Sequence, residues 1–291
     1  MNWEKEKFNW PFWENSHFFE TENCRWYYQV IGENSKPLLF MIHGAGASSH
    51  SWKNMIHLLS DYQVLCVDLP GHRFSKNLIN KRLDLNIIML DLVKLSKSLK
   101  RAPSIYLGHS IGAVIALQLA YEMNKIGIKT SAISINGALE TFEGPAGKIF
   151  PLMAKAMSWS PLTKYWVKLF NSAENSLKKL LSMSGSNLLE EDIEPYINLM
   201  KSTDHIQGTL ALISNWDIGT FNEILEKLNF PILFIIGEKD GIVPNANSVR
   251  ANKKVKTSHL IKIANAGHLV HEEKSRIVVA EVKNFYKSLT I

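Results

Sequence analysis

The stretch 105–114 constrains this chain most, because it combines a strand, a tight turn and a helix around one serine. An apolar run ends in the sequence GHSIG (108–112), and a second apolar run then begins at helical spacing. A side chain at either glycine would crowd the backbone where strand and helix pack closest. Such a turn strains the serine backbone and presents its hydroxyl at a helix N-terminus. We therefore interpret Ser110 as a candidate nucleophile.

Strands and helices alternate along the chain, which predicts an α/β fold with a mostly parallel, doubly wound sheet. Continuous apolar runs are typical of strands buried on both faces. The expected strands are 25–31, 38–42, 64–67, 105–109, 132–135, 231–237 and 259–263. Helical periodicity marks the segments 52–59, 83–99, 111–123 and 270–289.

The segment 137–229 has no clear buried strand, and its helical patterns are broken by prolines such as Pro145, Pro151 and Pro161. Its length far exceeds an ordinary connection of about 2–6 residues. We expect a helical cap, rich in Met and aromatic residues, over the carboxyl edge of the sheet, where ligands bind in open α/β folds. The predicted domains are therefore a core of 1–136 and 230–291, and a cap of 137–229.

A serine hydroxyl needs a base, and the base needs a third group to orient it. In this fold the expected order along the chain is serine, acid, histidine, each in a loop after a strand. Asp240 follows the strand at 231–237 and is the candidate acid; Glu238 lies in the same loop but closer to the strand. His268 follows the last strand and is the candidate base.

An oxyanion hole needs two backbone N–H groups aimed at the developing charge. We assign one to Ile111, directly after the serine, and the other to Ala45 in the loop HGAG (43–46) that follows a buried strand. The glycines of this loop let the backbone approach a substrate. The residues assigned to substrate binding are His43, Gly44, His109 and Trp216.

Composition and motifs argue against other classes of site. The net charge is +6, but the lysines are scattered, which disfavours nucleic-acid binding. No Gly-Lys-Ser/Thr follows the HGAG loop, and no His-Glu-x-x-His occurs, so we expect no nucleotide, cofactor or metal. Cys24 and Cys66 have no motif spacing and predict no disulfide framework.

The N-terminus, MNWEKEK, has no basic segment followed by an apolar one, and no stretch approaches the roughly 18 apolar residues of a spanning helix. These features predict a cytoplasmic protein without a membrane span. Residues 1–23 are strongly aromatic. We expect them to form a strand and an arm that pack on the body, in preference to a membrane or ligand edge.

Five motifs occur in a characteristic order: HGAGASSHSW, DLPGH, GHSIGA, GEKDGIVP and GHLVHEE. In them the chain resembles the α/β-hydrolase superfamily from about residue 25 to its end. The resemblance implies the nucleophile, acid and base already assigned, together with the two oxyanion donors. In one place the chain departs from the pattern: the superfamily often has Gly-His-Gly-x-Ser after Asp-Leu-Pro, and here Arg73 stands at the third position. We expect this charge near the pocket entrance.

A narrower resemblance lies in the arm and the predicted cap, over 9–32, 135–157 and 212–219. These stretches resemble the magnesium-chelatase accessory proteins of bacteriochlorophyll synthesis, which implies an association with tetrapyrrole metallation. Two hypotheses follow. The first is a serine hydrolase that cleaves esters with a hydrophobic moiety. The alternative is a tetrapyrrole-binding accessory protein whose partner is a magnesium chelatase.

Serine also separates this chain from dehalogenases and epoxide hydrolases, which have Asp at the nucleophile position. Hydrolases of C–C bonds and cofactor-free peroxidases share the same triad and stay open as alternatives.

Overall fold

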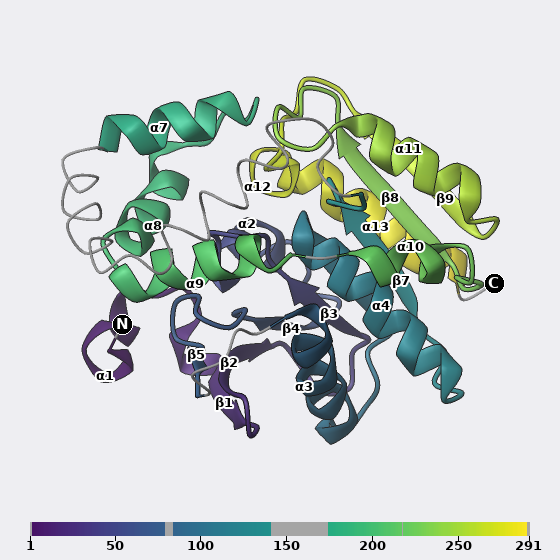
Figure 1. Cartoon of the computed structure of the whole chain (residues 1–291), viewed down its shortest axis with the longest axis horizontal. Coiled ribbons are helices and arrows are strands. Elements are labelled where there is room, and N and C mark those ends of the chain that lie inside the picture. The colour runs from purple at the N-terminus through teal and green to yellow at the C-terminus, as the bar shows by residue number, and fades with distance from the viewer. Residues whose placement is uncertain (1, 79–83, 141–173, 217, 290–291) are drawn as a thin grey trace.

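The computed structural model describes residues 2–78, 84–140, 174–216 and 218–289 of the chain. Within these residues a sheet runs in the order β1-β2-β4-β3-β6-β7-β8-β9, and β5 pairs with β2 (Figure 1). The strands are β1 (Ser16–Glu20), β2 (Cys24–Ile31), β3 (Leu38–Ile42), β4 (Gln63–Val67), β5 (Lys76–Asn77), β6 (Ile105–His109), β7 (Ser131–Ile135), β8 (Ile232–Gly237) and β9 (Ser258–Ile263).

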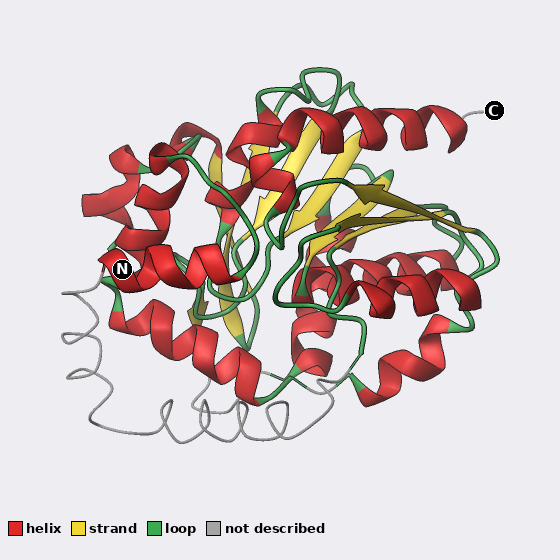
Figure 2. Cartoon of the chain, turned by 90° about the horizontal axis from the view of Figure 1, so that it is seen from above, coloured by secondary structure: helices red, strands yellow, loops and turns green. Residues whose placement is uncertain are grey.

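The six strands from β4 to β9 in this order are parallel, whereas β1, β2 and β5 pair antiparallel at one edge. Strands β3, β4, β6, β7 and β8 are buried along their whole length. This burial explains their continuous apolar sequences, because helices cover both faces of the sheet (Figure 2). The predicted α/β fold with a mostly parallel, doubly wound sheet is confirmed.

The helices are α1 (Trp3–Glu6), α2 (Lys53–Ile56), α3 (Leu85–Ser98), α4 (Ile111–Lys125), α7 (Glu174–Met183), α8 (Glu190–Met200), α9 (Thr203–Ser214), α10 (Gly219–Leu225), α11 (Asn245–Lys254), α12 (Val270–Glu273) and α13 (Ser275–Leu289). Helices α3, α4, α10 and α11 contribute to the apolar core on one face of the sheet. Helices α2 and α13 contribute to the core on the other face.

Helices α7 to α10 fall between β7 and β8, inside the predicted cap (Figure 1). We call this segment the insertion. The exact domain boundaries stay a prediction. The Met and aromatic residues expected at 142–170, and the prolines at 145, 151 and 161, lie outside the described residues.

Two expected helices differ in detail. The segment predicted as 52–59 begins with a 3-10 turn (Ser49–Trp52), and α2 ends at Ile56. The closing helix is divided into α12 and α13 at Lys274, whose φ of −126° and ψ of 35° are not helical. Among the described residues, none of the helices combines the length and the apolarity needed to cross a bilayer.

The aromatic arm packs on the body, as expected. Trp10 is buried in a cluster with Tyr27, Phe74 and Leu199, against which Trp3 also packs. The ring centroids of Trp3 and Phe74 are 5.0 Å apart. The arm therefore joins the antiparallel edge of the sheet to α8.

Candidate active site

Ser110 stands between β6 and α4 with a φ of 54° and a ψ of −119°. This left-handed φ is strained for any residue other than glycine. A Cβ at Gly108 would lie 2.0 Å from the carbonyl oxygen of Gly112, and a Cβ at Gly112 would lie 2.3 Å from that of Ile42. The crowding predicted at both glycines is therefore confirmed.

Backbone hydrogen bonds hold the serine in this conformation. Its N–H donates to the carbonyl of Ile135 at 3.0 Å, and its carbonyl accepts from Ala113 and Ala138, each at 3.1 Å. Ile111 is the first residue of the 15-residue helix α4 and is buried. The N–H groups of such a first turn have no helical acceptor and carry partial positive charge, which suits a developing oxyanion.

Asp240 and His268, which lie far apart in the sequence, are hydrogen-bonded. The Nδ1 of His268 lies 2.8 Å from Oδ2 of Asp240. The other carboxylate oxygen accepts from the N–H groups of Ile242 and Val243 at 2.8 and 2.9 Å. A carboxylate only accepts, so Nδ1 of the imidazole donates and Nε2 is left as an acceptor. That tautomer is the one a general base requires.

Asn136 holds the loop of the candidate base, a role that was not predicted from the sequence. Its amide group donates to the carbonyls of Gly267 and His268 at 2.9 and 2.8 Å, and its Oδ1 accepts from the N–H of Gly237 at 2.9 Å. One buried side chain thus ties β7 to the strand end before the acid and to the loop of the base. The sequence signal was only an Asn-Gly pair after a strand.

Residues 184–186, in the insertion, bridge the acid and base loops, and the sequence did not predict this either. The carbonyl of Ser184 accepts from the N–H groups of both Gly241 and His268, at 3.1 and 2.9 Å. Gly185 has a φ of +77°, and a Cβ there would lie 1.9 Å from a backbone oxygen of the acid loop. The two loops are therefore fixed relative to each other by a third segment, residues 184–186.

The loop 43–47 approaches the nucleophile closely. A Cβ at Gly44 would lie 3.0 Å from Cβ of Ser110 and 2.8 Å from Nδ1 of His109, so only glycine fits there without a shift. Ala45 follows directly and is half-buried. The loop that carries one candidate oxyanion donor thus packs against the residue that precedes the other.

His43 and His109 have backbone partners. His43 is fully buried; its Nδ1 donates to the carbonyl of Gly44 at 2.7 Å, and its Nε2 accepts from the N–H of Leu69 at 2.9 Å. Nε2 of His109 lies 2.9 Å from the carbonyl of His268, and the two rings are in contact, 4.6 Å apart. Both rings therefore support the loops of the site, and their contact with substrate stays a prediction.

Gly46 has imidazoles on both of its backbone groups. Its N–H donates to Nε2 of His72 at 3.2 Å, and its carbonyl accepts from Nε2 of His205, in α9, at 3.1 Å. Thr209, one turn further along α9, places its hydroxyl 3.2 Å from the same nitrogen of His72. The sequence assigned none of these side chains to the site.

Burial governs the charge of these rings, because a cation loses its hydration in the interior. It lowers the pKa of His72 to about 4 and that of His271 to about 3. It also lowers the pKa of other buried imidazoles well below the ordinary range: His43, His50, His109 and His205. All six are therefore neutral at pH 7.

Trp216 is half-buried against the core cluster that contains Ile111 and Leu212. Its indole Nε1 is buried and has no hydrogen-bond partner among the described residues. The position is compatible with the assignment to substrate binding, which stays a prediction.

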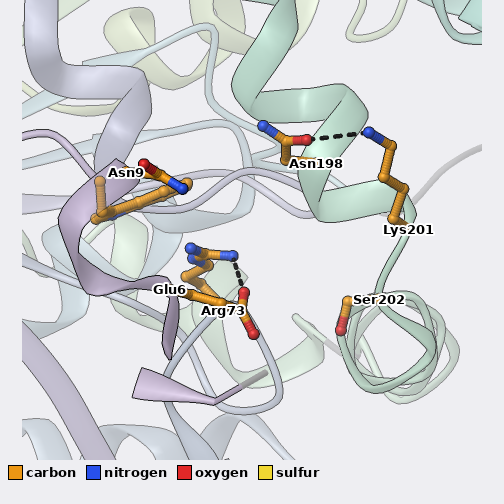
Figure 3. A pocket seen from close by; sticks show the side chains of 7 residues that line it. Glu6, Asn9, Arg73, Asn198, Lys201 and Ser202 are labelled. Carbon is orange, nitrogen blue, oxygen red and sulfur yellow. Dashed lines mark hydrogen bonds and ion pairs between the residues drawn. The ribbon is translucent and has the colours of Figure 1, made fainter. Parts of the chain in front are cut away.

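Arg73 differs from the expectation. Its guanidinium is directed toward the N-terminal arm, where it pairs with Glu6 at 3.0 Å (Figure 3). It also lies 4.1 Å from the ring centroid of Trp10. It lines a pocket of about 410 Å³ together with residues of the arm and of the α8–α9 connection, including Lys201 and Ser202. None of the predicted catalytic residues lines that pocket. Stacking on the arm decides the direction of this side chain.

Within the described ranges, no cluster of three or more His, Cys, Asp or Glu side chains is arranged to hold a metal ion.

Comparison with known proteins agrees with this architecture. The family model described as the alpha/beta hydrolase fold matches residues 37–275. An α/β-hydrolase fold protein from Burkholderia ambifaria superimposes with a TM-score of 0.75 at 19% identity, over 91% of this chain and 96% of the other.

Two curated relatives carry more specific names. The chain is 34% identical over 265 residues to the magnesium-chelatase 30 kDa subunit of Rhodobacter capsulatus, which covers 91% of this chain and 92% of the relative. It is 28% identical over 229 residues to a pimeloyl-[acyl-carrier protein] methyl ester esterase of Wigglesworthia glossinidia brevipalpis, covering 75% and 80%.

Proposed function

Because the chain belongs to the alpha/beta hydrolase fold family, we propose that it is a serine hydrolase that cleaves carboxylic esters with a hydrophobic moiety. One observation carries this proposal. His268 donates to the buried carboxylate of Asp240 at 2.8 Å, while Ser110 occupies a strained turn at the start of α4. A hydrogen-bonded acid and base at one sheet edge, beside such a turn, is the arrangement that serine nucleophiles use.

The mechanism follows from the assigned roles. Ser110 attacks the ester carbonyl while Nε2 of His268 takes the hydroxyl proton, and Asp240 stabilises the resulting imidazolium. The N–H groups of Ala45 and Ile111 stabilise the negative charge on the carbonyl oxygen. His268 then returns the proton to the leaving alcohol, and an acyl-enzyme remains. Water, activated by the same imidazole, releases the acid and restores the serine.

The hydrophobic moiety is proposed because the insertion packs apolar residues against the turn that carries Ser110. Leu212, Ile218 and Phe221 belong to the same buried cluster as Ile111 and Leu139. The similarity to a methyl ester esterase agrees with ester chemistry. The cytoplasmic location expected from the sequence stays a prediction.

The test is turnover and labelling. The purified protein should hydrolyse p-nitrophenyl esters, and a fluorophosphonate should label it at Ser110. The substitutions Ser110→Ala and His268→Ala should each abolish turnover, and Ser110→Ala should also abolish labelling. A protein that neither hydrolyses these esters nor reacts with the fluorophosphonate would not be a serine hydrolase of this kind.

A second function is favoured by one specific finding, the 34% identity to a magnesium-chelatase subunit over nearly the whole of both chains. On that basis the chain would be an accessory protein that binds a tetrapyrrole and has a magnesium chelatase as its partner. Titration of the Ser110→Ala variant with a porphyrin, alongside a chelatase assay with and without the protein, distinguishes the two. Tight porphyrin binding by a protein without esterase activity would favour the accessory role.

A further inference from the structure

Helix α9 of the insertion lies directly on the core, with backbone against backbone. A Cβ at Gly208 would be 2.3 Å from the carbonyl oxygen of Gly71, and one at Gly71 would be 2.6 Å from Cα of Gly208. No side chain can separate the helix from the loop after β4 at this point. The position of α9 relative to the core is therefore closely defined.

This contact brings His205, one turn earlier on α9, to the loop 43–47. His205 is 1% exposed. Its Nε2 donates to the carbonyl of Gly46 at 3.1 Å, and its Nδ1 accepts from the N–H of Arg73 at 3.2 Å. Both nitrogens are thus used, in a single neutral tautomer.

Ala45 lies between two peptide groups that imidazoles hold. The carbonyl of Gly44, in the same peptide plane as the N–H of Ala45, accepts from His43 at 2.7 Å. The next residue, Gly46, is held by His205 through its carbonyl, and its N–H donates to His72. The peptide that carries the Ala45 N–H is thus held by His43, and the next one by His72. His205 holds the peptide after that, so loss of its bond would free the chain on the C-terminal side of Ala45.

We propose that His205 is a positioning residue that fixes the loop 43–47, so that the oxyanion hole is complete only while α9 is docked on the core. The inference rests on the proposed hydrolase function for its catalytic meaning, but the contact itself does not. The titratable and charged groups that face His205 are His72, His50 and Arg73. Burial, together with these groups, keeps the pKa of His205 well below its ordinary range, and the ring stays neutral.

Two substitutions at His205 and one control separate positioning from plain destabilisation. His205→Phe keeps a ring of similar size but removes both hydrogen bonds. His205→Gln keeps a donor that can reach the carbonyl of Gly46. Tyr196→Phe is the control, because it removes another buried bond between insertion and core, the 2.6 Å bond from Tyr196 to Glu272, without touching Gly46.

Two measurements apply to each variant. Amide hydrogen exchange of peptides that cover 43–49 reports how firmly the loop is held, whether or not the protein has activity. Hydrolysis of p-nitrophenyl butyrate gives kcat and KM. We expect His205→Phe to speed exchange in this segment about tenfold. It should also lower kcat about 10- to 100-fold and leave KM within about twofold. This loss of kcat is smaller than the loss caused by deleting an oxyanion donor outright. His205→Gln should recover most of both effects, and Tyr196→Phe should show neither.

Unchanged exchange at 43–49 in His205→Phe, or equal effects in Tyr196→Phe, would overturn the proposal. So would a loss expressed in KM alone. If the wild-type protein neither turns over the ester nor reacts with a fluorophosphonate, the proposed hydrolase function fails, and the exchange result alone then decides whether His205 holds the loop.

Discussion

The loops that carry Asp240 and His268, here called the base side, are fixed by the carbonyl of Ser184 and the amide of Asn136. The loop 43–47, here called the oxyanion side, is fixed instead by three neutral imidazoles: His43, His72 and His205. Carbonyls and amides do not titrate in the physiological range, whereas His72, whose Nε2 accepts from the N–H of Gly46, must lose that bond when it is protonated.

The difference teaches that the two sides tolerate different disturbances. On the base side, the anchors at Ser184 and Asn136 are insensitive to pH, although His109 also bonds the carbonyl of His268. The oxyanion side depends on burial that keeps its imidazoles uncharged. The insertion contributes to both sides, through 184–186 and through α9, so its docking affects the whole site.

The largest effect should come from Asp240→Asn. Its Oδ1 would keep the two backbone N–H donors, so the amide nitrogen would face Nδ1 of His268 and force the wrong tautomer. We expect kcat to fall about 10⁴-fold at neutral pH, with folding preserved. Ester hydrolysis checks this, with Glu238→Gln in the same exposed loop as the matched control. A loss of kcat below tenfold would show that Asp240 is not the orienting acid.

Acidification should disturb the oxyanion side before the base side. Below pH 6.5 the unfolded chain protonates its histidines, whereas His72, with its pKa lowered to about 4, stays neutral in the folded state. The unfolded state then binds more protons, so stability falls as the pH drops from about 6.5 to 4, by up to about 1.4 kcal/mol per pH unit for each such group.

Two buried acids act in the opposite sense. Burial raises the pKa of Glu272 to about 8 and that of Asp68 to about 7, so the folded state holds their protons and stability falls as the pH rises from about 4 to 8. Six buried histidines outnumber these two groups below pH 6.5. Thermal unfolding should therefore show a steep loss of stability below pH 6, and exchange protection should fall first at 43–49. Earlier opening at 237–241 would contradict the comparison.

Asn136→Ala should damage the base side alone. It leaves the carbonyl of Gly267 and the N–H of Gly237 without this partner, at a cost of about 1–3 kcal/mol for each unsatisfied group. The carbonyl of His268 keeps its bond to His109. We expect a lower melting temperature and a kcat reduced about tenfold, a loss of position of the kind described for misplaced catalytic groups. Asn124→Ala is the control, because it removes two similar bonds at the far end of α4. It should lower the melting temperature without changing kcat.

The smallest effect on turnover should come from Arg73→Gly. The backbone N–H of Arg73 belongs to the oxyanion side, since it donates to His205, but the side chain belongs to the arm. The substitution keeps the first and removes the second, and it suits a φ of 45°. Turnover should stay within about threefold, whereas stability should fall by about 2 kcal/mol, because a buried guanidinium over two aromatic rings is lost. A large change in KM would instead indicate that the Arg73 side chain acts at the pocket entrance, as the sequence predicted.

The sequence alone was enough to predict the sheet, the strand-to-helix turn at Ser110 and the order of the three candidate catalytic residues. Parallel strands bring their carboxyl ends to one edge, so residues that follow different strands converge there without any knowledge of side-chain contacts. The hydrogen bond between Asp240 and His268 agrees with that logic. The need for glycine at 108 and 112 was also predicted from the sequence, because a strand-to-helix turn excludes a side chain at both positions.

Only the tertiary structure decided which side chains hold these residues in place. Asn136 and His268 are 132 positions apart, and His205 and Gly46 are 159 apart. No local period or motif encodes such pairs, because they depend on how the insertion docks on the sheet. The direction of Arg73 was decided in the same way, by an aromatic arm whose packing the sequence predicted but whose position on the body it could not give. Local sequence determines which backbone geometry each segment can adopt, whereas the packing of distant segments determines which side chains meet.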